Sequence, residues 1–212
     1  MLSVIRKTVS GFEAGLMVSI GGVVFLSCDN RYVGAILFSM ALLCICMKGY
    51  SIFTGKIGFI PEKHGKEEFS VLFLGLAGNF IGTLVCGLAF RYTFPAIGEA
   101  ARVLCEGKLT QNVPQTLIRG IFCGVLMYMS VSIYRDKKSF LGIFFCIPTF
   151  ILCGFEHTIA DMFYFAASGI VSLEACGFLW IVMAGNVIGG MLMPLLSGIG
   201  DKENKKAPEE VK

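Results

Sequence analysis

The sequence predicts an all-α membrane protein with six transmembrane helices, arranged as a 3+3 inverted repeat in which the second and fifth helices are broken. Three observations lead to this prediction. Hydrophobic residues make up 55% of the 212-residue chain and charged residues only 16%, against about 25% charged residues in soluble domains. Apolar runs of membrane-spanning length recur along the chain. Two short motifs also repeat, in the same order, about half a chain apart.

The composition excludes several classes of protein. A chain this poor in charge cannot cover a water-facing surface, which excludes a soluble globular enzyme and a disordered protein. The net charge of +3 is too small to indicate a nucleic-acid partner. The nine cysteines are scattered through the apolar runs without a CxxC pair or a Cys/His cluster, so we interpret them as packing residues. We expect one membrane domain, in contact with the lipid bilayer and without a metal or other cofactor.

Six apolar runs are long enough to cross a bilayer, at residues 11–28, 32–60, 69–90, 117–134, 140–170 and 173–196. The second and fifth runs are too long for one straight crossing. Each contains an interruption, at residues 48–55 and at residues 154–161. We therefore expect these two spans to be broken helices.

The predicted domain covers residues 1–200, with halves at about 1–105 and 106–200, and residues 201–212 are expected to form a charged, disordered tail. With six spans, both termini lie on the same side of the membrane. More Lys and Arg residues fall on that side than on the other. We therefore expect a multi-pass protein of the inner (plasma) membrane with both termini in the cytoplasm.

The repeated motifs predict that the two halves are related. Residues 77–82 read Ala-Gly-Asn-Phe-Ile-Gly, and residues 184–189 read Ala-Gly-Asn-Val-Ile-Gly. The interruption at residues 49–54 matches residues 154–159 at nearly the same offset. Three spans in each half place the halves in opposite orientations. The glycines are explained by helix packing, whereas the two asparagines must find partners in a medium without water.

The segment after the fifth-span interruption carries a family resemblance. Residues 154–163 read Gly-Phe-Glu-His-Thr-Ile-Ala-Asp-Met-Phe. This segment closely resembles the signature of the formate/nitrite transporter family, usually GFEHS[IV]ANMF. Ile52-Phe53-Thr54, both Ala-Gly-Asn motifs and the run Arg119–Cys123 extend the resemblance over all six spans. It implies a homopentamer, not an enzyme, in which each protomer passes small monovalent anions such as formate, nitrite, hydrosulfide, acetate or lactate.

The resemblance also implies roles for individual residues. His157 matches the central pore histidine, Thr54 the threonine that faces it, and Asn186 a sixth-span asparagine near the histidine. The remaining matches are Phe53, Ile52 and Phe150 at a cytoplasmic-side constriction, Leu42 and Phe38 at a periplasmic one, Met127 at a pore-narrowing position, and Lys108 and Lys7 as vestibule lysines. Without the resemblance, the apolar members of this set are ordinary packing residues.

The chemistry of the central histidine leaves two mechanisms open. An anion that crosses an apolar constriction loses its hydration, which is costly unless its charge is neutralised or hydrogen-bonded. His157 could offer a proton to a weak-acid anion, because histidine titrates near physiological pH. Alternatively, His157 only donates hydrogen bonds to an anion that passes as such.

Four positions depart from the family pattern. Ser51 replaces an acidic residue, Lys48 adds a positive charge nearby, Asp161 stands where the family has asparagine, and Gly124 where it has a fourth-span asparagine. Lys48, Glu156 and Asp161 are charges within the predicted spans. Because an unpaired buried charge is costly, we expect Lys48 to pair with Asp161 or Glu156. At Gly124 the pore is either wider or filled by a neighbouring side chain.

Three alternatives follow from these departures and from the general plan. The chain could be a non-transporting or altered-selectivity homologue with a modified pore. An intramembrane metal enzyme using His157, Asp161 and Glu156 lacks HExxH or a comparable ligand set. A neutral-solute channel of the aquaporin type shares the inverted plan but needs paired NPA motifs, which the sequence does not contain.

Overall fold

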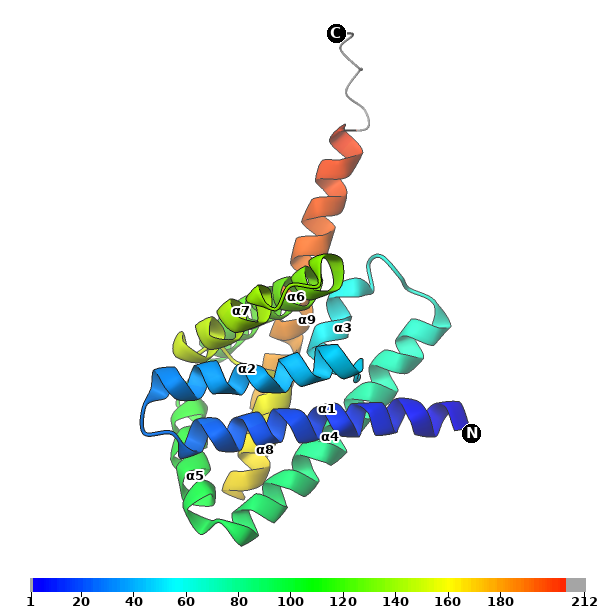
Figure 1. Cartoon of the computed structure of the whole chain (residues 1–212). Helices are drawn as coiled ribbons and strands as arrows, with labels where there is room; N and C mark the ends of the chain where they lie inside the picture. Colours follow the sequence, from blue (N-terminus) through cyan, green and yellow to red (C-terminus); the bar gives the residue numbers. More distant parts are fainter. Residues whose placement is uncertain (1, 205–212) are drawn as a thin grey trace, which may run out of the picture.

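The computed structural model describes residues 2–204, with side chains through residue 198, and is all-helical over that range (Figure 1). The elements in chain order are α1 (Leu2–Ser27), α2 (Arg31–Lys48), α3 (Phe53–Lys56), the short 3₁₀ helix η1 (Ile57–Phe59), α4 (Lys66–Thr93), α5 (Pro95–Leu109), α6 (Val113–Lys137), α7 (Leu141–Leu152), α8 (Thr158–Ser168) and α9 (Leu173–Asn204).

Among the described residues, five helices are long and apolar enough to cross a membrane, namely α1, α2, α4, α6 and α9. The second expected span is α2 followed by α3 and η1, and the fifth is α7 followed by α8. The prediction of an all-α membrane protein is confirmed. Residues 201–204 continue α9 where the sequence predicts a tail, and residues 205–212 of that tail lie outside the described residues.

Helix α5 is missing from the sequence prediction, which has a loop between the third and fourth spans. Pro95 lies in its first turn, where a missing N–H is tolerated. Ile97, Ala101 and Cys105 are buried at intervals of four residues, so they form one apolar face, which packs on α8. Lys108 lies three residues after Cys105, so α5 also brings this lysine to its contact with α8.

The two longest helices of each half cross at glycines. In the first half, a Cβ atom on Gly78 of α4 would lie 2.1 Å from the carbonyl oxygen of Thr8 in α1. In the second half, a Cβ atom on Gly185 of α9 would lie 2.7 Å from the carbonyl oxygen of Leu117 in α6. These glycines belong to the two Ala-Gly-Asn motifs, so the repeat in sequence is a repeat of the same close crossing.

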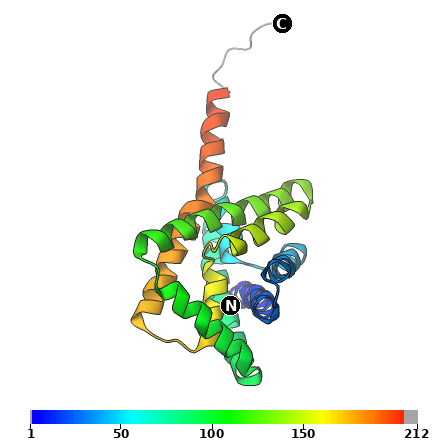
Figure 2. The ribbon, with the colours of Figure 1, turned by 90° about the vertical axis from the view of Figure 1, so that its left-hand side faces the viewer.

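The corresponding helices α2 and α7 pack on each other and run in opposite directions (Figure 1). The short helices that follow them, α3 and α8, lie in the interior, with α1 and α2 on one side and α9 on the other (Figure 2). The fold therefore places the two backbone interruptions next to each other, inside a shell of long helices.

The glycine crossings predict a large effect for a single methyl group. We expect Gly78→Ala to lower the stability of the protein by about 1–3 kcal/mol, because the backbones of α1 and α4 must separate. The melting temperature in detergent measures this effect. Gly177→Ala in α9 is the matched control, since a Cβ atom there meets nothing within 4 Å. Equal melting temperatures for the two variants would contradict the crossing described here.

Candidate functional site

The interruption between α7 and α8 is held by Asn186 of α9. Its Nδ2 group donates to the carbonyl oxygens of Gly120, at 2.9 Å, and Glu156, at 2.8 Å. Its Oδ1 atom accepts from the backbone N–H of Thr158, at 2.9 Å, and from the hydroxyl of Thr158, at 2.8 Å. The side chain thus satisfies the backbone on both sides of residue 157, which is required where no water is available.

The interruption between α2 and α3 is held in the same way by Asn79 of α4. Its Nδ2 group donates to the carbonyl oxygens of Gly11 and Ser51, each at 2.8 Å, and its Oδ1 atom accepts from the N–H of Phe53 at 2.9 Å. Both asparagines are fully buried. Each half therefore uses its Ala-Gly-Asn motif to hold its own interruption.

His157 is the last residue of the interruption before α8, and its side chain meets Thr54 of α3. It is 3% exposed and is the N-cap of α8, where its Nδ1 atom accepts the backbone N–H of Ala160 at 3.2 Å. Its Nε2 atom lies 2.7 Å from the hydroxyl oxygen of Thr54, which is also buried. Because Nδ1 uses its lone pair as an acceptor, the proton of a neutral ring is on Nε2. His157 then donates from Nε2 to Thr54.

His157 lines two of three neighbouring cavities. The first, the Lys108 cavity, has a volume of about 410 Å³ and is lined in part by Arg31, Lys108, Arg119, Glu156 and His157. The second, the central chamber, has a volume of about 10 Å³ and is lined in part by Leu42, Met127 and His157. The third, the Arg135 cavity, has a volume of about 240 Å³ and is lined in part by Lys56, Arg135 and Lys138.

The cavities are separated by apolar side chains that line two of them at once. Phe38 and Phe150 line both the Lys108 cavity and the central chamber, and their rings pack edge to face with centroids 6.4 Å apart. Ile45 and Ile52 line both the central chamber and the Arg135 cavity. An aromatic pair and an aliphatic pair therefore separate the central chamber, which His157 lines, from the two larger cavities.

The comparisons with known proteins concern the chain as a whole. The sequence model described as formate/nitrite transporter matches residues 1–198. The chain belongs to the formate/nitrite transporter family. It is 26% identical over 185 residues to the uncharacterized transporter YrhG of Bacillus subtilis, a match that covers 80% of this chain and 68% of YrhG. It is 23% identical over 237 residues to the nitrite transporter NirC of Salmonella typhimurium, covering 96% of this chain and 86% of NirC.

Solved structures share the fold. A pentameric formate channel with formate bound superposes with a TM-score of 0.73 at 20% identity, covering 96% of this chain and 98% of that one. An FNT family ion channel superposes with a TM-score of 0.71 at 21% identity, covering 90% of this chain and 86% of the other. At these identities the structural likeness establishes the fold of a formate/nitrite transporter family channel.

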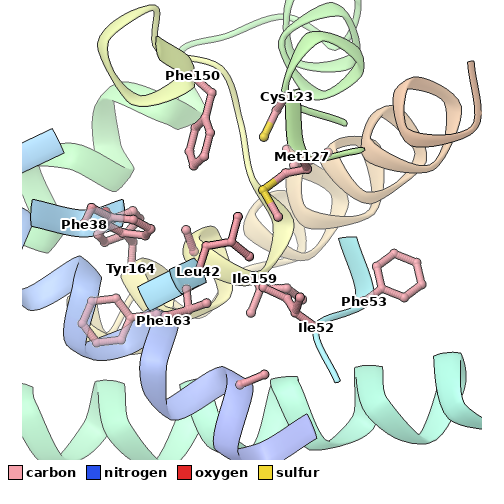
Figure 3. Packing of buried hydrophobic residues seen from close by; sticks show 14 of the residues in the cluster. Phe38, Leu42, Ile52, Phe53, Cys123, Met127, Phe150, Ile159, Phe163 and Tyr164 are labelled. Carbon is pink, nitrogen blue, oxygen red and sulfur yellow. The ribbon is translucent and has the colours of Figure 1, made fainter. Parts of the chain in front are cut away.

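Two predicted constriction residues lie elsewhere. Phe150 lies with Phe38 on the Lys108 side of the histidine, and not with Ile52, because the last turns of α7 pack on α2. Phe53 is buried outside the three cavities described above, on the far side of Ile52 (Figure 3). The backbone N–H of Phe53 donates to Asn79, and this bond holds the backbone from which the side chain leaves.

Two other predicted apolar residues line the central chamber itself. Leu42 follows Phe38 one turn along α2 and contributes to the chamber instead of to the constriction. Met127 of α6 lies across from Leu42 (Figure 3). Asn186 and Thr54, both expected in the pore, are not among the described residues that line the three cavities. The side chain of Asn186 is fully used by the backbone, and the hydroxyl of Thr54 meets His157, which does line two of them.

The predicted ion pair of Lys48 is wrong. The cation that pairs with Glu156 and Asp161 is Lys108 of α5. Lys48 is exposed at the last position of α2, and the next residue, Gly49, lines the Arg135 cavity. Lys48 therefore lies toward the other end of the path from the two carboxylates.

Two further departures have local explanations. Gly124 does not widen the path, because a Cβ atom there would lie 2.5 Å from the carbonyl oxygen of Asn186. The absence of a side chain at Gly124 lets α6 and α9 pack closely. Lys7, expected in a vestibule, pairs with Glu67 at 2.9 Å and donates to Ser70 at 2.9 Å, so it ties the start of α1 to the start of α4.

Sequence reasoning missed the two arginines of the Lys108 cavity. Arg31 donates to the carbonyl oxygens of Ile151, at 3.1 Å, and Leu152, at 3.3 Å, and Arg119 donates to that of Gly154 at 3.3 Å. The first two carbonyls belong to the last two residues of α7 and the third lies two residues beyond its end, where a cation is favoured by the helix dipole. Arg31 directly precedes the second apolar run and Arg119 lies near the start of the fourth, and nothing at either position indicated this role.

The backbone role of Asn186 leads to a stability prediction. We expect Asn186→Ala to lower the free energy of unfolding by more than a simple cap loss, because each buried group left without a partner costs about 1–3 kcal/mol. Asn186→Asp should also destabilise, since it removes both donors. Asn112→Ala, which removes an exposed helix cap worth about 0.5–2 kcal/mol, is the comparison. A melting temperature for Asn186→Ala at or above that of Asn112→Ala would refute the assignment.

Proposed function

We propose that this member of the formate/nitrite transporter family passes small monovalent anions such as formate, nitrite, hydrosulfide or a short carboxylate through its own pore. The observation that carries this proposal is the His157–Thr54 pair, which lies between an aromatic and an aliphatic constriction that separate two cavities with basic walls. Its relatives and fold neighbours include proteins named nitrite transporter and formate channel.

The pair supplies what an anion needs at the narrow point. An anion that leaves water for an apolar constriction must be met by hydrogen-bond donors, because dehydration without compensation is costly. Nε2–H of His157 is one donor, and the Thr54 hydroxyl, which accepts from it, has its own proton to donate. Two neutral donors can bind an anion weakly enough to release it.

The cap at α8 favours a neutral His157 over a proton-donating one. A second proton would have to sit on Nδ1, which accepts the N–H of Ala160. It would break this cap and place a positive charge at the positive end of a helix dipole. We therefore infer that His157 acts by hydrogen bonding and that the solute does not take its proton from the imidazole.

Passage requires side chains to move. The central chamber, at about 10 Å³, holds no more than about one water molecule. Phe38 and Phe150 on one side, or Ile45 and Ile52 on the other, must change rotamer to admit an anion. We propose that the structure is the closed form of the path.

The assembly and orientation are inferred from the family and from charge. One fold neighbour is a pentameric formate channel, so we propose that five copies assemble, each with its own path, in the inner membrane. The Arg135 cavity, with Lys56 and Lys138, lies on the side that the positive-inside rule assigns to the cytoplasm. Both termini are then cytoplasmic.

Flux into liposomes tests the proposal directly. Liposomes that contain the purified protein should take up formate, nitrite or hydrosulfide faster than empty liposomes do. His157→Asn keeps an acceptor for the α8 cap but removes the Nε2 donor, so flux should fall about ten- to a hundredfold, as expected for a lost hydrogen bond to a charged group. His64→Asn, at an exposed loop position, is the matched control and should transport normally. Absence of flux for every anion would defeat the proposal.

A pair of variants at Thr54 separates the hydroxyl from the shape of the side chain. Thr54→Ser keeps the hydroxyl and should retain most of the flux. Thr54→Val keeps the volume but leaves His157 without its acceptor and removes one donor, so flux should fall about tenfold or more. Equal flux through the two variants would show that the hydroxyl takes no part.

A homologue of altered selectivity is the second candidate, favoured by one observation. Asp161 adds a carboxylate to the wall of the Lys108 cavity, where the family pattern has asparagine. The same flux measurement, made over a series of anions and with ammonium as a cation, distinguishes this homologue from an anion channel. A pore that excludes anions would pass none of the anions in the series.

A further inference from the structure

Two carboxylates share one lysine on the wall of the Lys108 cavity. Nζ of Lys108 contacts Oε2 of Glu156 and lies 2.9 Å from Oδ1 of Asp161. Both carboxylates are at most 2% exposed, and the lysine side chain is 12% exposed. If all three groups are ionised, the cluster has one uncompensated negative charge in a dehydrated place, which is strongly unfavourable.

The four carboxylate oxygens are not equivalent. Both oxygens of Glu156 have partners, since Oε2 meets Lys108 and Oε1 accepts from Nε2 of Gln111 at 2.6 Å. Oδ1 of Asp161 also meets Lys108. Oδ2 of Asp161 is buried and has no hydrogen-bond partner among the described residues, although Asp161 lines the cavity. Oδ2 is therefore the one atom of the cluster with a place for a further ligand.

The groups that face Asp161 do not supply the missing charge. They are Lys108 and Cys105 from α5, Glu156 and His157 from the interruption, Cys123 from α6 and Tyr164 from α8 itself. Lys108 is the cation of the set, and no ion pair reaches Asp161 from α1, α3, α4 or α9 in the described part of the chain. The guanidinium groups of the same cavity donate to carbonyl oxygens at the end of α7.

We propose that Asp161 binds a proton on Oδ2 at the wall of the Lys108 cavity, and that this proton controls whether an anion can reach His157. The control of anion access rests on the proposed function, whereas the proton on Oδ2 does not. The proton comes from water in the cavity and returns to it. Binding takes the cluster from one net negative charge to neutrality and converts Oδ2 from an acceptor into an O–H donor on a residue that lines the cavity.

The proton changes the local field in the direction that an anion needs. With Oδ2 protonated, the cluster is neutral and offers a hydrogen bond to an arriving anion. With Oδ2 deprotonated, a net negative charge close to His157 repels it. An asparagine, as in the family pattern, carries a side-chain N–H donor at every pH. With Asp161, a donor is present in this place only when the carboxyl group is protonated. Anion flux should rise as the pH falls.

Infrared spectroscopy tests the proton without reference to transport. Wild-type protein should have a carbonyl stretching band of a buried protonated carboxylic acid that shifts in deuterium oxide and disappears as the pH is raised. The band should be absent in Asp161→Asn and present in Asp29→Asn, which replaces an exposed aspartate with the same amide. If Asp161→Asn does not fold, wild-type protein titrated in both solvents still tests the proposal, because absence of the band from wild-type protein overturns it. Absence of the band, or its persistence in Asp161→Asn, would overturn the proposal.

Flux tests the control of transport. The ratio of wild-type to Asp161→Asn flux, taken at each pH with the same anion gradient, cancels the titration of the anion itself. The ratio should fall by up to about tenfold per pH unit as Asp161 deprotonates, the limit for one proton. The ratio for Asp29→Asn should not change with pH. A constant ratio for Asp161→Asn would refute the control of anion access.

The two measurements separate this inference from the proposed function. An infrared band without flux of any anion would leave the proton site in place and reject the proposed function. Flux without the band would support the proposed function and reject the proton on Asp161. A melting temperature that rises with sodium or ammonium but not with acid would assign the balancing charge to a small cation and likewise reject the proton.

Discussion

The two interruptions exist because a pair of asparagines meets the hydrogen-bonding demand of non-helical backbone at membrane depth. Water is absent there, so every exposed N–H and C=O needs an internal partner. Asn79 and Asn186 each bridge the two sides of an interruption and the neighbouring long helix. The glycines of the same motifs bring the helices close enough for these bonds. The position of His157 depends on this arrangement, since both neighbouring peptide units are held by Asn186.

One scaffold, used twice, presents different chemistry in its two halves. The residue that caps the short helix after each interruption lines the central chamber, and it is Ile52 before α3 and His157 before α8. These positions correspond in the repeated motifs. The matching backbone of the two interruptions therefore places one side chain from each half at the chamber. The side chain from the first half, Ile52, is apolar, and that from the second half, His157, is a hydrogen-bond donor. A polar group thus faces an apolar one across a chamber that admits little water.

Hydropathy and repetition predicted the spans, the interruptions and the need of the two asparagines for partners, because these depend on local composition and spacing. Helix α5, the side on which Phe150 lies and the partner of the buried carboxylates could not be derived in that way. Lys108 is 48 positions from Glu156 in the chain, and only the packing of α5 on α8 brings them together. Lys48 is nearer in sequence to its own interruption but ends on an exposed turn of α2. Pairing between distant charges is a property of the packing and not of any local pattern.

The use of Lys108 by two carboxylates bears on how an anion is attracted without being trapped. A free buried lysine would hold an anion strongly, and conduction needs binding that is favourable but weak. Here the positive charge that remains in the Lys108 cavity belongs to Arg31 and Arg119, which are anchored on the carbonyl oxygens that end α7. In the function we propose, attraction is then concentrated in the Lys108 cavity, while the deeper contacts come from the neutral pair of Thr54 and His157. For the anions of the proposed function, this separation means that the field gathers them before the aromatic constriction and that no full charge at the narrow point retains them.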